Sequence, residues 1–249
     1  MIIAHLTYDI PTLKACAATC LCWYNIAIPH LHHTLILRPW GKGTSHRHPT
    51  PLVSLDKLGL LPFVKQVRFE RQPPAPWVCS TIFDSRTIRH FRALVNLQEL
   101  TITDINFHRF REGTGKYFGY FSPTLRSITL NGPRGTCRQL LEFFTLFPKL
   151  DNIKLTYYFG QPPTHEGHST RRNAIRGGLR GQLVIANYGA GVGLLEDIIV
   201  AFGGMRFSSM ELEYVPGMRL LLEACADTLQ TFRWYPDGAF QICNVILVS

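Results

Sequence analysis

Short apolar patterns of one form recur along most of this chain. Residues 97–102, 125–130 and 150–155 all have the form Leu-x-x-Φ-x-Φ, where Φ is Leu or Ile. The last two Φ positions alternate with polar residues, which is typical of a short strand with one buried face. The leading Leu precedes the strand, at the point where the chain turns into it.

Further copies of the pattern lie on both sides of these three. They occupy residues 64–69, 207–212 and 229–234, with a weaker copy at 180–185. The intervals between the first buried strand residues are 33, 28, 25, 30, 27 and 22 residues, which suits one strand plus one return helix. These marker residues are Val67, Leu100, Ile128, Ile153, Leu183, Met210 and Phe232.

The segments between the predicted strands carry helical patterns. Residues 138–147 have an apolar stripe that Pro148 stops, 193–202 are followed by two glycines, and 218–226 form a third such segment. Parallel strands joined by right-handed helical crossovers form the βα solenoid of leucine-rich repeats. We therefore expect an α/β chain with a leucine-rich-repeat-like solenoid at 39–249. The alternative is an ordinary α/β domain in which the spacing is coincidental.

Residues 1–38 have a different pattern. Apolar residues at three- and four-residue steps from Leu13 to Ala27 predict one amphipathic helix, which Pro29 closes, and a first strand follows within 31–37. Residues 39–63 are expected to form a linker and then a short helix near 53–61. The apolar tail at 236–249 either adds a terminal strand or is an abnormal end of the repeats.

The N-terminal segment resembles the F-box domain, in the form that precedes leucine-rich-repeat-like regions in proteins of mushroom-forming fungi. The resemblance rests on Ile-Ile-x-x-Leu at 2–6, Pro-Thr-Leu-x-x-Cys-x-x-Thr-Cys-x-x-Trp-Tyr-x-Ile-Ala at 11–27 and Pro-His-Leu at 29–31. Residues 218–232 resemble the repeat body of the same proteins. The usual Leu-Pro-x-Glu opening is absent, so we expect an F-box that is truncated at its N-terminus.

This resemblance implies a substrate receptor of a cullin-type E3 ubiquitin ligase. The N-terminal helices would bind a Skp-type adaptor and the cullin complex, and the repeats would bind a protein target that the sequence does not identify. In the family, a residue like Trp23 packs inside the domain. The adaptor-binding candidates are Leu6, Pro11, Leu13 and Cys20.

The target would meet the strand positions between the buried ones, because these point to the concave side of a solenoid. Their mixed charge favours protein recognition over a phosphate backbone. The candidates are Gln66, Arg68, Glu99, Thr101, Ser127, Thr129, Asn152, Lys154, Glu211, Glu213 and Arg233.

Charge does not change this interpretation. The net charge of +9 and the pI of 9.4 permit nucleic-acid binding, yet the basic residues are scattered and form no run of like charges. We therefore expect no nucleic-acid role. The alternatives that remain are a stand-alone repeat protein that binds protein or nucleic acid with no ligase link, and a non-functional truncated family member.

Catalytic and cofactor motifs are weak. The glycines at 189–193 only partly match a dinucleotide-binding fingerprint, because Leu194 stands where the third glycine should be. Cys16, Cys20 and Cys22 lie near several histidines, but buried thiols are a better interpretation than a zinc site. The group from His30 to His48 is expected at the surface. We predict no enzyme activity, no cofactor and no metal.

The seven cysteines form no dense framework, and neither a secretory signal nor a long apolar run occurs. We expect a reducing compartment, cytoplasmic or nuclear, and no membrane contact.

Overall fold

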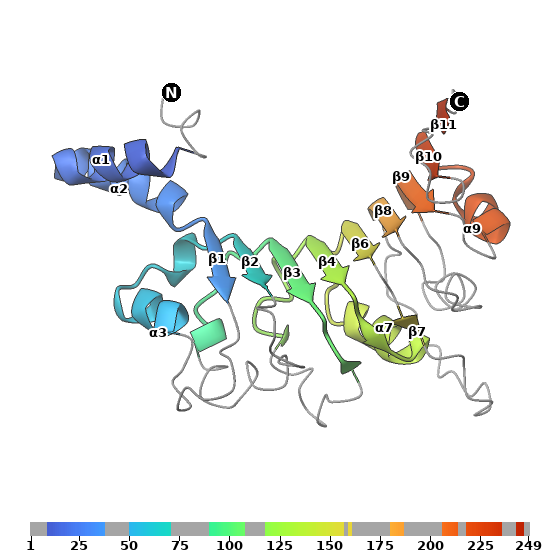
Figure 1. Ribbon diagram of the computed structural model, residues 1–249, viewed down its shortest axis with the longest axis horizontal. Helices are drawn as coiled ribbons and strands as arrows, with labels where there is room; N and C mark the ends of the chain where they lie inside the picture. The colour runs from blue at the N-terminus through green and yellow to red at the C-terminus, as the bar shows by residue number, and fades with distance from the viewer. Residues whose placement is uncertain are drawn as a thin grey trace.

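The computed structural model describes residues 9–37, 50–70, 90–107, 118–156, 159–160, 180–186, 206–213, 218–235 and 243–246. The predicted helix at 193–202, the glycines at 189–193 and Leu6 lie outside these ranges. Within them the chain is an α/β protein built on one large sheet, as predicted (Figure 1).

The large sheet has nine strands in the described chain, and their order in space follows their order in the sequence. All neighbours pair in parallel except the last pair, in which β11 runs antiparallel to β10. The predicted tail therefore adds a terminal strand. The strands are β1 (Thr34–Leu37), β2 (Gln66–Phe69), β3 (Glu99–Thr103), β4 (Ser127–Asn131), β6 (Asn152–Thr156), β8 (Arg180–Ala186), β9 (Arg206–Glu213), β10 (Thr231–Tyr235) and β11 (Cys243–Ile246). A small second sheet pairs β5 (Arg134–Gly135) with β7 (Phe159–Gly160).

The apolar strand positions form continuous rows across the sheet. The seven predicted marker residues, from Val67 to Phe232, lie opposite one another on successive strands, and all are buried. The second apolar position of each strand forms another buried row, from Leu37 to Leu212. The predicted alternation of buried and exposed strand residues is thus confirmed.

The start of each strand is fixed to the strand before it. The carbonyl oxygen of Lys65 accepts hydrogen bonds from the backbone N–H groups of Gln98 and Glu99, at 2.8 and 3.0 Å. The carbonyl of Arg126 likewise accepts from Asp151 and Asn152, at 2.8 and 2.9 Å. Because one carbonyl satisfies two donors at each step from β2 to β6, these strands begin at the same level and their rows stay in register.

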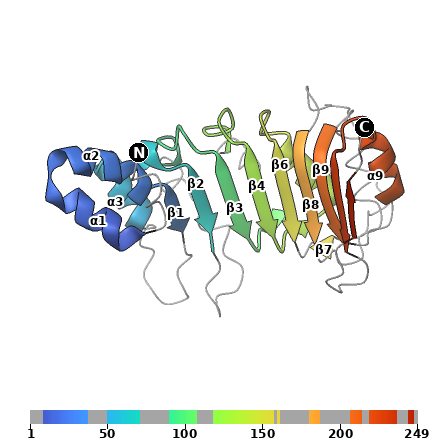
Figure 2. The same cartoon turned by 90° about the horizontal axis from the view of Figure 1, so that it is seen from above.

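Helices cover one side of the sheet. In Figures 1 and 2, α3 (Thr50–Lys57) lies beneath β1, α7 (Cys137–Phe144) lies beneath the middle strands, and α9 (Met218–Cys225) lies outside the C-terminal strands. The predicted helices at 138–147 and 218–226 are confirmed, and α7 ends before Pro148. The helix expected near 53–61 begins earlier, at Thr50, and is followed by the 3-10 helix η2 (Leu61–Phe63).

The core beneath the middle strands is rich in phenylalanine. The ring of Phe118 meets that of Phe143 edge-on, with centroids 5.0 Å apart, and Phe143 meets Phe147 at 5.2 Å. This geometry is the one that aromatic rings prefer. These residues belong to a single cluster that runs from Leu35 of β1 to Phe232 of β10.

The N-terminal segment departs from its prediction. The single helix expected from residue 12 to residue 28 is two helices, α1 (Ile10–Thr19) and α2 (Leu21–Leu31), which lie side by side as a hairpin (Figures 1 and 2). Cys20 separates them because its backbone is extended, with φ −162° and ψ 167°.

The end of α2 also differs from the prediction. Pro29 lies inside the helix, because the next turn still forms through the hydrogen bond from His32 N–H to the carbonyl of Ile28, at 3.0 Å. The first strand begins at Thr34, within the predicted range of 31–37.

Candidate binding surfaces

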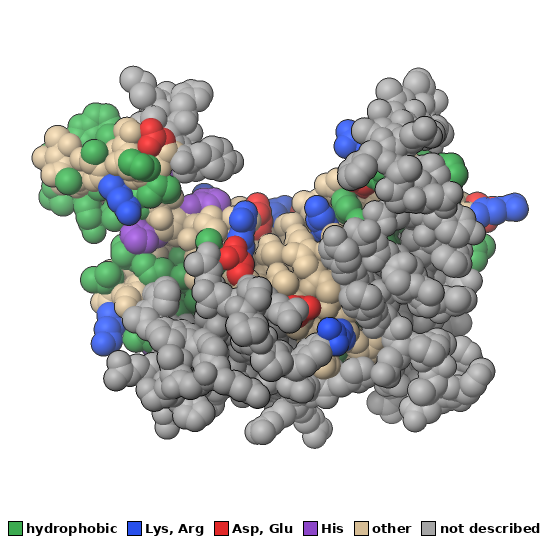
Figure 3. All heavy atoms as spheres, in the orientation of Figure 1, with side chains coloured by type: hydrophobic (Ala, Val, Ile, Leu, Met, Phe, Trp, Pro, Cys, Tyr) green, Lys and Arg blue, Asp and Glu red, His purple; other side chains and the backbone are tan. Residues whose placement is uncertain are grey.

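The side of the sheet opposite α3 and α7 is free of helices in the described chain. The sheet curves toward this side, and the surface in Figure 3 is hollowed over its middle strands, between the α1–α2 hairpin and the C-terminal strands. Two further rows alternate with the buried rows here, and all their positions are exposed or half-exposed except Val184, which is buried. We call this side the polar face. Its first row is Thr34, Gln66, Glu99, Ser127, Asn152, Gln182, Ser209 and Thr231, and its second row is Ile36, Arg68, Thr101, Thr129, Lys154, Val184, Glu211 and Arg233.

Ten of the eleven predicted target-binding residues belong to these two rows. The eleventh, Glu213, ends β9 opposite Tyr235 of β10. The alternation of the sequence was sufficient to place them, because neighbouring residues of a strand point to opposite faces.

The acidic side chains of the polar face already have partners. Gln66 Nε2 donates a hydrogen bond of 2.9 Å to Glu99 Oε2, and Thr34 Oγ1 donates one of 3.0 Å to Gln66 Oε1. The Tyr235 hydroxyl donates to Glu211 Oε1 at 3.0 Å. This bond to a carboxylate is the main cause that raises the pKa of Tyr235 above its usual value.

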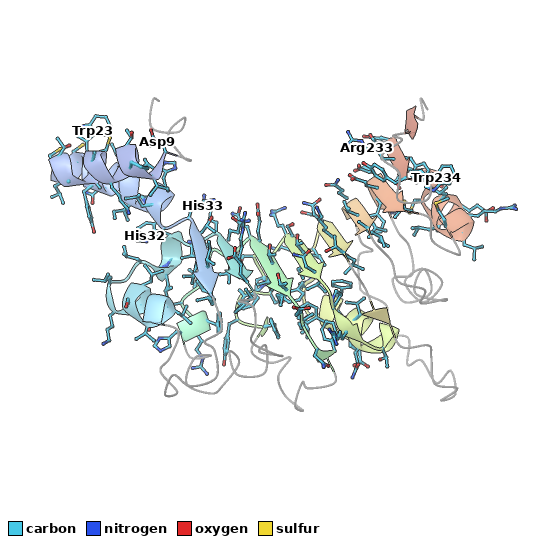
Figure 4. The ribbon with its side chains drawn as sticks, in the orientation of Figure 1. Asp9, Trp23, His32, His33, Arg233 and Trp234 are labelled. Atoms are coloured by element: carbon cyan, nitrogen blue, oxygen red, sulfur yellow. The ribbon has the colours of Figure 1, made fainter. Side chains whose placement is uncertain are left out.

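The basic side chains of the same face differ from the acidic ones. Arg68, Lys154 and Arg233 are exposed, and none forms a hydrogen bond or ion pair with another residue of the described ranges. Figure 4 shows Arg233 on the polar side of β10 and Trp234 on the side of α9. The polar face therefore has unpaired cations beside carboxylates that are held by neutral donors.

An open hollow of about 240 Å³ lies in the middle of the polar face. Ile153 and Val184, both buried, are its apolar members. Its polar lining comes from β4, β6, β8 and β9 and consists of Ser127, Thr129, Asn152, Lys154, Gln182 and Glu211. The hydroxyl and amide groups can donate to and accept from a peptide backbone. Among the described residues, no group of three or more His, Cys, Asp or Glu is placed to hold a metal ion.

The α1–α2 hairpin has a small core of its own. Leu13 is completely buried and packs with Ala27, and Ala17 and Leu31 lie against them. Asp9 caps α1: its carboxylate accepts hydrogen bonds from Thr12 Oγ1 at 2.7 Å and from Thr12 N at 3.1 Å. These bonds, the side-chain one first, lower the pKa of Asp9.

Many apolar side chains of the hairpin lie outside this core. Leu21 is 74% exposed, Trp23 and Tyr24 are each 41% exposed, and Ile10 and Ile26 are 38% exposed. Apolar side chains cover much of the hairpin in Figure 3, and Trp23 lies on its outer side, away from the sheet, in Figure 4. An exposed apolar patch of this kind is typical of a protein-interaction site.

These positions correct several sequence predictions. Leu13 is buried between the helices, so its side chain is not available to a partner, whereas Pro11 and Cys20 are exposed. Trp23 was expected inside the domain, and Cys20 and Cys22 were expected to be buried; these predictions are wrong. All follow from the break at Cys20, which gives α2 a different orientation from the one that a continuous helix would have.

The sequence prediction also missed Leu21, Tyr24 and Ile26 as exposed residues. The signal was present, because α2 is apolar on nearly all sides and a two-helix unit cannot bury them all.

His32 and His33 lie at the junction of α2 and β1 (Figure 4). The sequence predicted them at the surface, but both are half-buried. Burial lowers the pKa of His32. Burial also lowers the pKa of His33, with a further contribution from Lys65, and Glu99 opposes the shift.

Comparison with protein-family models, with characterised proteins and with solved structures finds no match for this chain. None of the described helices combines the length and the apolar character needed to cross a membrane.

Proposed function

We propose that this chain is a non-catalytic interaction protein, the substrate receptor of a cullin-type ubiquitin ligase. The α1–α2 hairpin would dock on a Skp-type adaptor, and the polar face would hold the protein to be modified. The proposal includes the architecture: the large sheet and its outer helices form a leucine-rich-repeat-like solenoid, preceded by an F-box-like hairpin.

The strand arrangement supports the solenoid. The strands of the large sheet lie side by side in chain order, and equivalent positions of successive copies of the sequence pattern lie opposite one another. The same backbone carbonyl position accepts the same pair of donors at successive strand starts. Stacking of like units produces this regularity.

The observation that carries the adaptor role is the apolar surface of the hairpin. A helix pair whose own core is little more than Leu13 and Ala27 exposes Leu21, Trp23 and Tyr24 in one short segment. Burial of this surface would stabilise a complex by roughly 25 cal/mol per Å² of apolar area before the costs of association. The resemblance of residues 11–31 to the F-box domain suggests a Skp-type adaptor as the partner of this surface.

A capture experiment with matched variants tests this role. The full chain is mixed with a purified Skp-type adaptor and recovered through a tag. Leu21→Ser removes the most exposed apolar side chain of the hairpin, and Leu58→Ser makes the same change at a position that is 69% exposed but lies after α3. We expect the wild type and Leu58→Ser to capture the adaptor and Leu21→Ser to capture several-fold less.

The outcomes separate the alternatives. Equal capture by both variants would place the adaptor contact elsewhere. If the wild type captures no adaptor, the ligase role fails and a stand-alone binding protein is left, because the polar face does not depend on the hairpin.

A further inference from the structure

The polar face has a spacing of cations that selects one kind of ligand. Arg68, Lys154 and Arg233 all belong to its second row, on β2, β6 and β10. Three strand steps separate each cation from the next. Since neighbouring strands lie about 4.8 Å apart, the cations recur about every 14 Å along the row.

An extended peptide that crosses the strands matches this interval. Such a peptide advances about 3.3 Å per residue, so 14 Å corresponds to about four residues. Acidic side chains about four residues apart would therefore reach successive cations. The hollow around Lys154 has the side-chain amides of Asn152 and Gln182, which have no hydrogen-bond partner among the described residues and can bond to the peptide backbone between the cations.

The charges of the face favour an acidic ligand over a basic one. The three cations have no described ion-pair or hydrogen-bond partner, whereas Glu99 and Glu211 each accept a hydrogen bond from a neutral side chain. A carboxylate ligand gains a charge-assisted bond at a free cation. A basic ligand would meet carboxylates that Gln66 and Tyr235 already engage, with cations nearby.

We propose that the polar face binds an extended acidic segment of a protein, with carboxylates about four residues apart seated on Arg68, Lys154 and Arg233. This proposal depends on the proposed ligase function in one respect only, namely that the acidic segment belongs to the protein that the ligase modifies. Binding itself requires no adaptor.

The test measures binding of the full chain to capped fluorescent peptides by anisotropy. The first peptide has a Ser- and Gly-based sequence of about twelve residues with Glu at three positions spaced by about four residues. A second has Gln at those positions. A third has the same three Glu residues adjacent to one another, so that its net charge equals that of the first.

We expect the spaced Glu peptide to bind, the Gln peptide to show no saturable binding, and the adjacent-Glu peptide to bind several-fold more weakly. Lys154→Gln should weaken binding of the spaced peptide by about tenfold or more, the usual effect of losing one hydrogen bond to a charged group. Arg68→Gln should also weaken it. Lys57→Gln, on α3 and away from the polar face, should leave affinity unchanged.

Three results would overturn the proposal: equal binding of the Glu and Gln peptides, equal binding of the spaced and adjacent peptides, or no effect of Lys154→Gln. A single-stranded DNA oligonucleotide of thymidines that binds more tightly than the peptide and is lost with Lys154→Gln would make the face a nucleic-acid site instead. Adaptor capture is read independently. Capture without peptide binding rejects this inference alone, and peptide binding without capture rejects the ligase role alone.

Discussion

Gly181 is a position of the sheet that should not tolerate even a methyl side chain. It lies in β8 with φ +86°, next to an irregularity in which β9 holds one more residue than β8. A methyl group on its Cα would lie 2.1 Å from the carbonyl oxygen of Asp151 and 2.9 Å from the carbonyl carbon. The obstacle is backbone at the start of the adjacent strand, so it cannot turn aside as a flexible side chain would.

The cost of Gly181→Ala has two parts. Holding a residue other than glycine at positive φ costs about 1–2 kcal/mol. Forcing a methyl into occupied space costs about 1–3 kcal/mol, because the backbone must shift. The carbonyl of Asp151 also accepts the hydrogen bond from Gln182 N, at 3.0 Å, and that bond would move with it. We expect Gly181→Ala to lower the free energy of unfolding by about 2–5 kcal/mol.

Gly59 provides the matched control. Its φ is +66°, and no heavy atom lies within 4 Å of an added methyl group. Gly59→Ala should therefore lower the free energy of unfolding only by the backbone part, about 1–2 kcal/mol. The difference between the two variants isolates the overlap with Asp151.

Urea unfolding followed by circular dichroism measures both variants, with linear extrapolation to water. Wild type and variants must have similar slopes for the comparison to hold. Equal losses at Gly59 and Gly181 would refute the reasoning, since the overlap would then cost nothing. Gln182 lies in the hollow of the polar face, so peptide affinity of Gly181→Ala should fall as well.

Two further predictions concern the N-terminal half. Cys20 is the N-cap residue of α2, and its side chain makes no capping hydrogen bond. Cys20→Ser supplies a capping hydroxyl and should raise the free energy of unfolding by about 0.5–1 kcal/mol, measured by urea unfolding. An equal gain in Cys22→Ser would contradict this prediction. The lowered pKa values of His32 and His33 mean that the unfolded chain binds protons first as the pH falls below about 6.5. Their contribution to stability is thus complete above that pH and is lost below it. The Tm of the wild type should therefore fall between about pH 7.5 and pH 5.5, and it should fall less steeply when both histidines are replaced by Gln. An unchanged slope in the double variant would contradict the role of these two histidines.

The strands could be predicted because their signal is local. Leu97, Leu125 and Leu150 mark where the chain turns into a strand, and all are buried as the pattern implies. The alternation that follows each of them determines which side chains face the core. Identical spacing from the leading Leu then brings Leu100, Ile128 and Ile153 into one row without any further information.

The hairpin could not be predicted in the same way, because its break has no local signal. Neither glycine nor proline stands at Cys20, and apolar residues continue at helical spacing across it. The packing of Leu13 on Ala27 is a tertiary contact that requires the chain to reverse there. A continuous helix would have separated these two residues by most of its length.

Which charges of the polar face have partners could not be predicted from the sequence either. Alternation places Lys154 and Glu211 on one side of the sheet, but whether a charge is free depends on the neighbouring strand. Glu211 is engaged because the parallel register brings Tyr235, which follows it by 24 residues, within hydrogen-bond reach. The bias of the face toward acidic ligands therefore emerges only once the register is known.

The two proposed surfaces lie far enough apart to act at the same time. The hairpin precedes β1, and the hollow is centred near β6, four strand steps further along the sheet, which is about 19 Å. The strands from β1 to the hollow belong to one continuous core, so the distance between β1 and the hollow is fixed by packed structure. A partner on Leu21 and Trp23 would thus leave the hollow open, and a peptide that extends from Arg233 to Arg68 would end one strand short of β1. A receptor needs this separation, because it must hold its adaptor and its target together without competition.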